Sequence, residues 1–127
     1  MTLVFVHARI SSIALIYSAA VGLWALYTVY QKRDLDSNFW GALAINELIF
    51  VAQTVIGLLM VAQGAQPTRT VHYLYGAVGI LTIPAAFAYT RGQGTRREAL
   101  IYGLICLFLA GVSIRAATTG AIALPMP

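Results

Sequence analysis

The chain alternates between long apolar segments and short polar stretches. The apolar segments cover residues 10–30, 39–62, 71–90 and 99–119. Each has close to the roughly 20 residues that a helix needs to cross the hydrocarbon core of a bilayer. Backbone polar groups in lipid must be hydrogen-bonded within their own segment, so helices are expected and strands are not. The pattern therefore predicts four transmembrane helices.

The polar stretches between these segments are short. They cover residues 31–38, 63–70 and 91–98, and they are rich in turn-forming and charged residues. Connections of this length bring consecutive helices side by side in opposite directions. The fold class expected is all-α, an integral membrane four-helix up-down-up-down bundle that forms one transmembrane domain over residues 1–127.

Composition agrees with membrane insertion. Hydrophobic residues make up 60% of the chain and charged residues only 9%, whereas about a quarter of the residues in a soluble domain are charged. The lipid bilayer is thus the first expected partner. The net charge of +4 is interpreted as membrane topology and lipid contact, and no nucleic-acid partner is predicted.

The basic residues are unevenly divided between the two predicted membrane surfaces. The first and third polar stretches hold five of them, Lys32, Arg33, Arg91, Arg96 and Arg97, and the other side holds three, Arg9, Arg69 and Arg115. Because basic loops favour the cytoplasm, the first and third stretches are expected there. Both chain termini are then expected on the non-cytoplasmic side.

The two histidines of the chain are the leading candidates for chemistry. His7 and His72 each stand at the beginning of an apolar segment, at similar expected depth within about the first helical turn. Small residues follow at helical spacing: Ser11 after His7, and Gly76 and Gly79 after His72. Such positions let a flat molecule or a neighbouring backbone approach closely.

Haem b is the ligand that this set of residues suits. Haem iron takes two axial ligands, and imidazole is a common one, so His7 and His72 are predicted to ligate one iron between the first and third helices. Ser11, Gly76 and Gly79 would leave room for the macrocycle. Its anionic propionates favour guanidinium groups, which Arg9, Arg69 and Arg115 would supply near the same level.

In helix number and in histidine placement, the chain resembles four-helix membrane cytochromes of the b type. Such proteins often carry two histidine pairs and hold a haem at each side of the membrane, whereas this chain has one pair at most. The resemblance implies a small electron-transfer protein that exchanges electrons with a quinone or a redox protein.

Other interpretations remain open. The histidines are equally explained as interfacial residues, and the small residues as ordinary helix-packing positions. The protein would then be a non-catalytic structural or accessory subunit of a larger membrane complex. A transporter that oligomerises around Glu47 is less well supported. A homo-oligomer is compatible with each interpretation, and no catalytic residues are predicted.

Glu47 is an acidic residue inside an apolar segment. It lies nine residues beyond Asn38, or roughly 13 Å along a helix, well inside the hydrocarbon. A carboxyl group at that depth is expected to be protonated or paired, because burial disfavours the charged form. Its predicted role is a structural tether to a donor such as Tyr27 or Tyr102, with a proton or quinone contact as the alternative.

Overall fold

A computed structural model of the protein describes residues 2–67 and 69–119. Within these residues the chain is all-helical, as predicted, with four helices. They are α1 (Thr2–Tyr30), α2 (Ser37–Ala62), α3 (Val71–Thr90) and α4 (Arg96–Thr119). Each is long and apolar enough to cross a membrane. Residues 1, 68 and 120–127 of the predicted domain lie outside the described residues.

The helix starts differ from the predicted ones. α1 begins at Thr2 and not at residue 10, so His7 lies in its second turn. Arg9 lies within this helix, and its guanidinium lies over the ring of Phe5, 5.1 Å from the ring centre, one helical turn earlier. α2 and α4 also begin two and three residues before the predicted starts at 39 and 99.

Side-chain caps explain the early starts of α2 and α4. The carboxylate of Asp36 accepts a hydrogen bond of 2.9 Å from the Phe39 amide, which satisfies one of the free N–H groups at the start of α2. Before α4, the Thr95 amide donates to Glu98 Oε1 over 2.9 Å, and the Thr95 hydroxyl donates to the same oxygen. Capping residues are polar, so they fall outside a boundary drawn around apolar residues.

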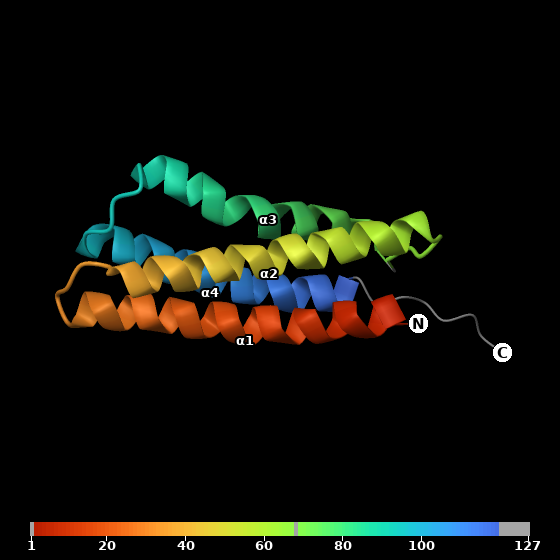
Figure 1. Ribbon diagram of the computed structural model, residues 1–127, viewed down its shortest axis with the longest axis horizontal. Helices are drawn as coiled ribbons and strands as arrows, with labels where there is room; N and C mark the ends of the chain where they lie inside the picture. The colour runs from red at the N-terminus through yellow and green to blue at the C-terminus, as the bar shows by residue number, and fades with distance from the viewer. Residues whose placement is uncertain (1, 68, 120–127) are drawn as a thin grey trace.

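Each helix packs against two neighbours, in the cyclic order α1, α2, α3 and α4. The interface between α1 and α4 is the most extensive, and the one between α2 and α3 is the smallest. Figure 1 shows the beginning of α1 and the end of α4 at the same end of the bundle. At the opposite end the two loops touch, since the Leu35 amide donates to the Gly94 carbonyl over 2.8 Å.

Two glycines allow α1 and α4 to meet at their backbones. A Cβ atom at Gly22 would lie 3.0 Å from the carbonyl oxygen of Gly103. A Cβ atom at Gly103 would lie 2.7 Å from the Cδ2 atom of Leu26 and 3.3 Å from the carbonyl oxygen of Gly22. Ala14 and Ser18, on the same face of α1, are also buried. Small residues on this face therefore serve helix packing.

A buried polar cluster joins three helices near the centre of the bundle. The Ser18 hydroxyl on α1 donates to Asn46 Oδ1 on α2 over 2.9 Å, and Asn46 Nδ2 lies 3.7 Å from the Cys106 sulfur on α4. All three side chains are fully buried. Because polar groups inside an apolar bundle need partners, this cluster fixes how α1, α2 and α4 meet.

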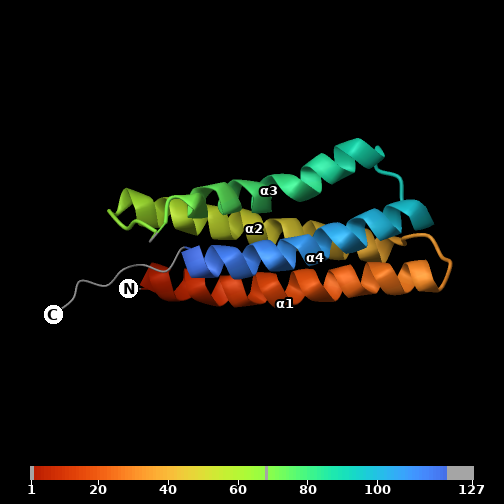
Figure 2. The same cartoon turned by 180° about the vertical axis from the view of Figure 1, so that it is seen from behind.

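Helix α3 lies apart from α2 over much of its length. Pro84 lies inside α3, and the absence of an N–H at proline leaves the carbonyl of Ile80 without its helical partner. Figures 1 and 2 show the second half of α3 bending away from α2. The helices touch where Phe50 packs on Gly79, since a Cβ atom at Gly79 would lie 2.9 Å from Phe50 Cδ1. Cavities lie on both sides of this contact.

Candidate cofactor-binding cavity

One of the two cavities contains both histidines, and we call it the histidine cavity. Its volume is about 580 Å³, and residues of all four helices line it, including His7, Gln53, His72 and Ser113. Cofactor pockets typically have volumes of about 300–1,000 Å³ and mostly apolar walls. The histidine cavity has the size and character of such a site.

The imidazole rings of His7 and His72 lie next to each other on the wall of this cavity, edge to face. Their centres lie 6.2 Å apart and their planes are inclined by 69°. His7 lies in the second turn of α1, and His72 is the second residue of α3. The histidines are brought together although α1 and α3 share no helix–helix interface among the described residues. The two histidines that the sequence analysis paired therefore lie close together in the folded protein.

A hydrogen bond to α4 orients the ring of His72. Its Nδ1 atom lies 2.9 Å from the carbonyl oxygen of Ala116. Because a carbonyl can only accept, Nδ1 carries the hydrogen and donates it. In the neutral ring, Nε2 then keeps its lone pair. Metal-bound histidines commonly show this arrangement, with the other ring nitrogen donating to a backbone carbonyl.

Three polar atoms on the lining of the histidine cavity have no hydrogen-bond partner. They are His7 Nδ1, Gln53 Oε1 and Ser113 Oγ, and all three are buried. Gln53 is held in place by its other end, since its Nε2 donates to the backbone carbonyl of His7 over 2.8 Å. Buried polar atoms in native proteins nearly always have a partner. Three such atoms around one cavity indicate that it holds polar groups in the working protein.

Of the predicted small residues, two belong to the cavity and one does not. Ser11 and Gly76 line it, and no atom lies within 4 Å of a Cβ placed at Gly76. Gly79 instead packs against Phe50 and supports the contact between α2 and α3. Gly57 on α2, which was not predicted, also lines the cavity. A Cβ atom placed there would lie 3.4 Å from His7 Cε1.

The predicted arginines are not part of the cavity wall. Arg9, Arg69 and Arg115 are exposed, and the lining within the described residues contains no arginine. Arg69 and Arg115 flank the site along the chain. The Arg69 carbonyl accepts a hydrogen bond of 3.1 Å from the His72 amide, and Arg115 precedes Ala116, which accepts from the His72 ring.

Gln53, Gly57 and Ser113 were not predicted as site residues, although they line the histidine cavity. Gln53 and Gly57 are four residues apart and so share a face of α2. This spacing was an available signal. Ser113 stands alone on an apolar stretch of α4, and only the packing of the bundle brings it to the cavity.

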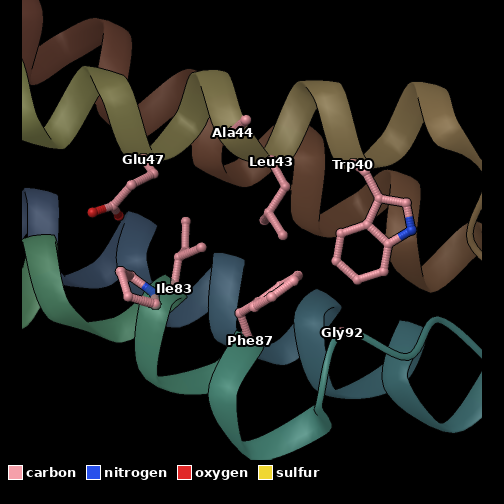
Figure 3. Close-up of a pocket in the computed structure, with 8 residues that line it drawn as sticks. Trp40, Leu43, Ala44, Glu47, Ile83, Phe87 and Gly92 are labelled. Carbon is pink, nitrogen blue, oxygen red and sulfur yellow. The ribbon is translucent and has the colours of Figure 1, made fainter.

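Glu47 lies away from the histidines, in a groove between α2 and α3. Figure 3 shows its side chain extending from α2 toward α3, beside Leu43 and opposite Ile83. The predicted tether does not form: Glu47 Oε1 is buried without a partner. The hydroxyl of Tyr102 is instead hydrogen-bonded to the hydroxyl of Thr90 over 2.8 Å. Tyr27 is exposed and stacks on Tyr30.

The described residues contain no group of three or more His, Cys, Asp or Glu side chains that could hold a metal ion. Cys106 is buried and lies against Asn46.

Comparisons with protein-family models, with curated proteins and with solved structures found no match to this chain.

Proposed function

We propose that the protein is a small membrane b-type cytochrome that holds one haem between α1 and α3 and transfers electrons. The observation that carries this proposal is the adjacent pair of imidazoles, His7 and His72, on a cavity of about 580 Å³. Haem b is bound without covalent attachment, so axial ligands and a shaped cavity are what the protein must provide.

His7 and His72 are the residues that would hold the iron of a haem. Imidazole is a common ligand of haem iron, and the two rings are close enough in space to serve one cofactor. The centres of His7 and His72 lie 6.2 Å apart. The fixed tautomer of His72 supports the same assignment, because its Nε2 keeps the lone pair that a metal bond needs.

The remaining residues of the cavity have roles that follow from their positions. Haem iron supplies one-electron chemistry by changing between its ferrous and ferric states. Gln53 holds the backbone of His7, and its Oε1 is an acceptor without a partner on the same cavity wall. Gly57 lies against the His7 ring. Arg9, Arg69 and Arg115 are proposed to face the propionates from the cavity rim.

We also propose that the chain crosses the membrane as an up-down-up-down bundle. At most 44% of the residues in the apolar window of any helix are buried within the protein, so large apolar surfaces remain for lipid. Leu48 on α2 and Leu81 on α3, for example, are each 62% exposed. The helix directions in Figure 1 support this order. A quinone or a redox protein is the proposed electron-transfer partner.

Membrane orientation gives the first testable prediction. With the first and third loops in the cytoplasm, a reporter enzyme fused after Pro127 is expected to be active only outside the cytoplasm. A reporter inserted within residues 91–98 is expected to be active only inside. Paired fusions that are active on opposite sides of the membrane measure this directly. If both reporters give the reverse result, the histidine cavity faces the cytoplasm.

The haem proposal is tested by the absorption spectrum of the unmodified protein. Produced with ample haem supply and purified in mild detergent, it is expected to carry about one haem per chain and to show the sharp bands of six-coordinate, low-spin iron after reduction. A haem extraction assay gives the stoichiometry. A folded protein that contains no haem under these conditions would contradict the proposal and would favour an accessory subunit.

A further inference from the structure

The second cavity is a groove between α2 and α3 on the other side of the Phe50–Gly79 contact. It has a volume of about 600 Å³, and we call it the Glu47 groove. Its walls are Trp40, Leu43 and Ala44 from α2, and Ile83, Pro84 and Phe87 from α3. Figure 3 shows Trp40 and Phe87 at one end of the groove and Glu47 at the other. Glu47 is the acidic group among otherwise apolar walls.

The carboxyl of Glu47 lacks a partner within the described protein. Its Oε1 atom is buried and makes no hydrogen bond. A buried polar oxygen without a partner is costly in an apolar setting. The groove is open on one side, so a molecule that enters it can supply the missing hydrogen bond. The polar part of that molecule must reach Glu47, and its remainder must suit apolar walls.

The depth of Glu47 restricts what this molecule can be. Glu47 is ten residues from the start of α2 at Ser37, or roughly 15 Å along the helix, and the hydrocarbon core is about 30 Å thick. This step rests on the proposed membrane insertion. Charged phospholipid headgroups stay at the membrane surface, and acyl chains carry no polar group for Oε1. The occupant must therefore be an uncharged, lipid-soluble molecule with a polar head.

The shape of the groove favours a flat ring as that head. The Trp40 and Phe87 rings meet edge to face, with centres 5.9 Å apart, and they close one end. Leu43 and Ile83, both buried, form apolar surfaces across from each other. Pro84 lies inside α3, and Figure 1 shows the second half of this helix bending away from α2. A carboxylic acid can donate to a ring carbonyl and accept from a ring hydroxyl, so it suits both forms of a quinone.

We infer that the Glu47 groove binds the head of a membrane quinone, with the Glu47 carboxyl as its hydrogen-bond partner. The isoprenoid tail leaves through the open side of the groove into lipid. This site is separate from the histidine cavity, and binding there does not require that haem is bound.

The two tryptophans of the chain provide an internal probe and its control. Trp40 lines the groove, whereas Trp24 lies on α1 against Phe39. In Trp24→Phe, emission comes from Trp40 alone, and in Trp40→Phe it comes from Trp24 alone. Titration of the protein in lipid nanodiscs with a short-tailed benzoquinone is expected to quench Trp40 with saturation. Trp24, which is 38% exposed, is expected to show only weak, linear quenching from quinone dissolved in lipid.

Variants of the groove then locate the bound ring. On the Trp24→Phe background, Glu47→Leu removes the hydrogen bond and is expected to weaken quinone binding about tenfold. Glu47→Gln keeps a donor and an acceptor and is expected to weaken it less than threefold. Ala44→Phe fills part of the groove while the Glu47 carboxyl is kept, and it is expected to weaken binding at least tenfold. Gln53→Leu, the matched change on the same helix at the histidine cavity, is expected to leave binding unchanged.

Each contrary result overturns the inference. Linear quenching of Trp40 would mean that the quinone only dissolves in the bilayer. Unchanged binding in both Glu47→Leu and Ala44→Phe would place the quinone elsewhere, and weaker binding in Gln53→Leu alone would place it in the histidine cavity. Helix content and elution as a single species show that a variant is folded. Bound haem also quenches tryptophan emission, so quenching is measured relative to the same protein before quinone is added, and the haem result itself is measured by visible absorption.

Discussion

His7→Ala and His72→Ala are each expected to abolish the low-spin spectrum of bound haem. In a bis-imidazole site each histidine supplies one of two axial bonds, so loss of either leaves the iron five-coordinate. The change of spin state is expected even if the macrocycle stays in the cavity. Visible absorption of the reduced and oxidised proteins measures the effect, and the expected loss of the six-coordinate low-spin signal is complete in each single variant.

Two controls separate ligand loss from damage to the cavity. Ser12→Ala removes a polar group from another residue on the cavity lining and is expected to keep the low-spin spectrum. Free imidazole is expected to restore that spectrum in the histidine variants, because it can enter the space that the ring has left. If either alanine variant keeps the original spectrum, His7 and His72 are not a ligand pair, and the accessory-subunit interpretation gains support.

Arg115 offers a graded comparison with the histidines. It precedes Ala116, whose carbonyl orients the His72 ring, and it is proposed to face a propionate. Loss of a propionate contact removes no iron ligand, so Arg115→Gln is expected to retain a low-spin spectrum and to show weaker haem retention than the unmodified protein. The contrast is expected because a histidine would bind the iron, whereas Arg115 would contact only a propionate.

The helices were predictable because length and apolarity alone decide them. Runs of about 20 apolar residues leave helices as the available structure in lipid, and α3 has the predicted bounds of residues 71–90. The predicted start of α1 was eight residues too late, because the apolar segment was counted from residue 10, after Arg9. A charged side chain can lie along a helix surface when an aromatic ring is one turn away, and spacing alone does not show that it will.

The histidines, Ser11 and Gly76 of the candidate site were predicted from the sequence, and the rest of the cavity lining was not. Small residues at helical spacing show which residues share a face, but not what lies opposite that face. Gly76 opens onto the histidine cavity and Gly79, three residues later, packs against Phe50. The difference depends on how α2 approaches α3, which the sequence of either helix does not contain. The arrangement of the helices also explains why the predicted tether of Glu47 does not form. Its expected partner Tyr102 is hydrogen-bonded to Thr90 instead.

The close approach of α1 and α4 gives the prediction with the largest expected effect on stability. Gly103→Leu is expected to destabilise the bundle by at least about 2 kcal/mol, because overpacking a filled interface typically costs 1–3 kcal/mol. A Cβ atom at residue 103 would already lie 2.7 Å from Leu26 Cδ2 and 3.3 Å from the Gly22 carbonyl oxygen. The two helices would have to separate to accept a larger side chain.

Gly111 provides the matched control on the same helix. It is exposed, and no atom lies within 4 Å of a Cβ placed there, so Gly111→Leu is expected to be neutral or slightly stabilising through helix propensity. Thermal unfolding in detergent, followed by circular dichroism, compares the two variants. Equal midpoints would show that the backbones of α1 and α4 do not meet at Gly103. Because α1 carries His7 and α4 carries the Ala116 carbonyl that orients His72, Gly103→Leu is also expected to weaken haem binding, and Gly111→Leu is not.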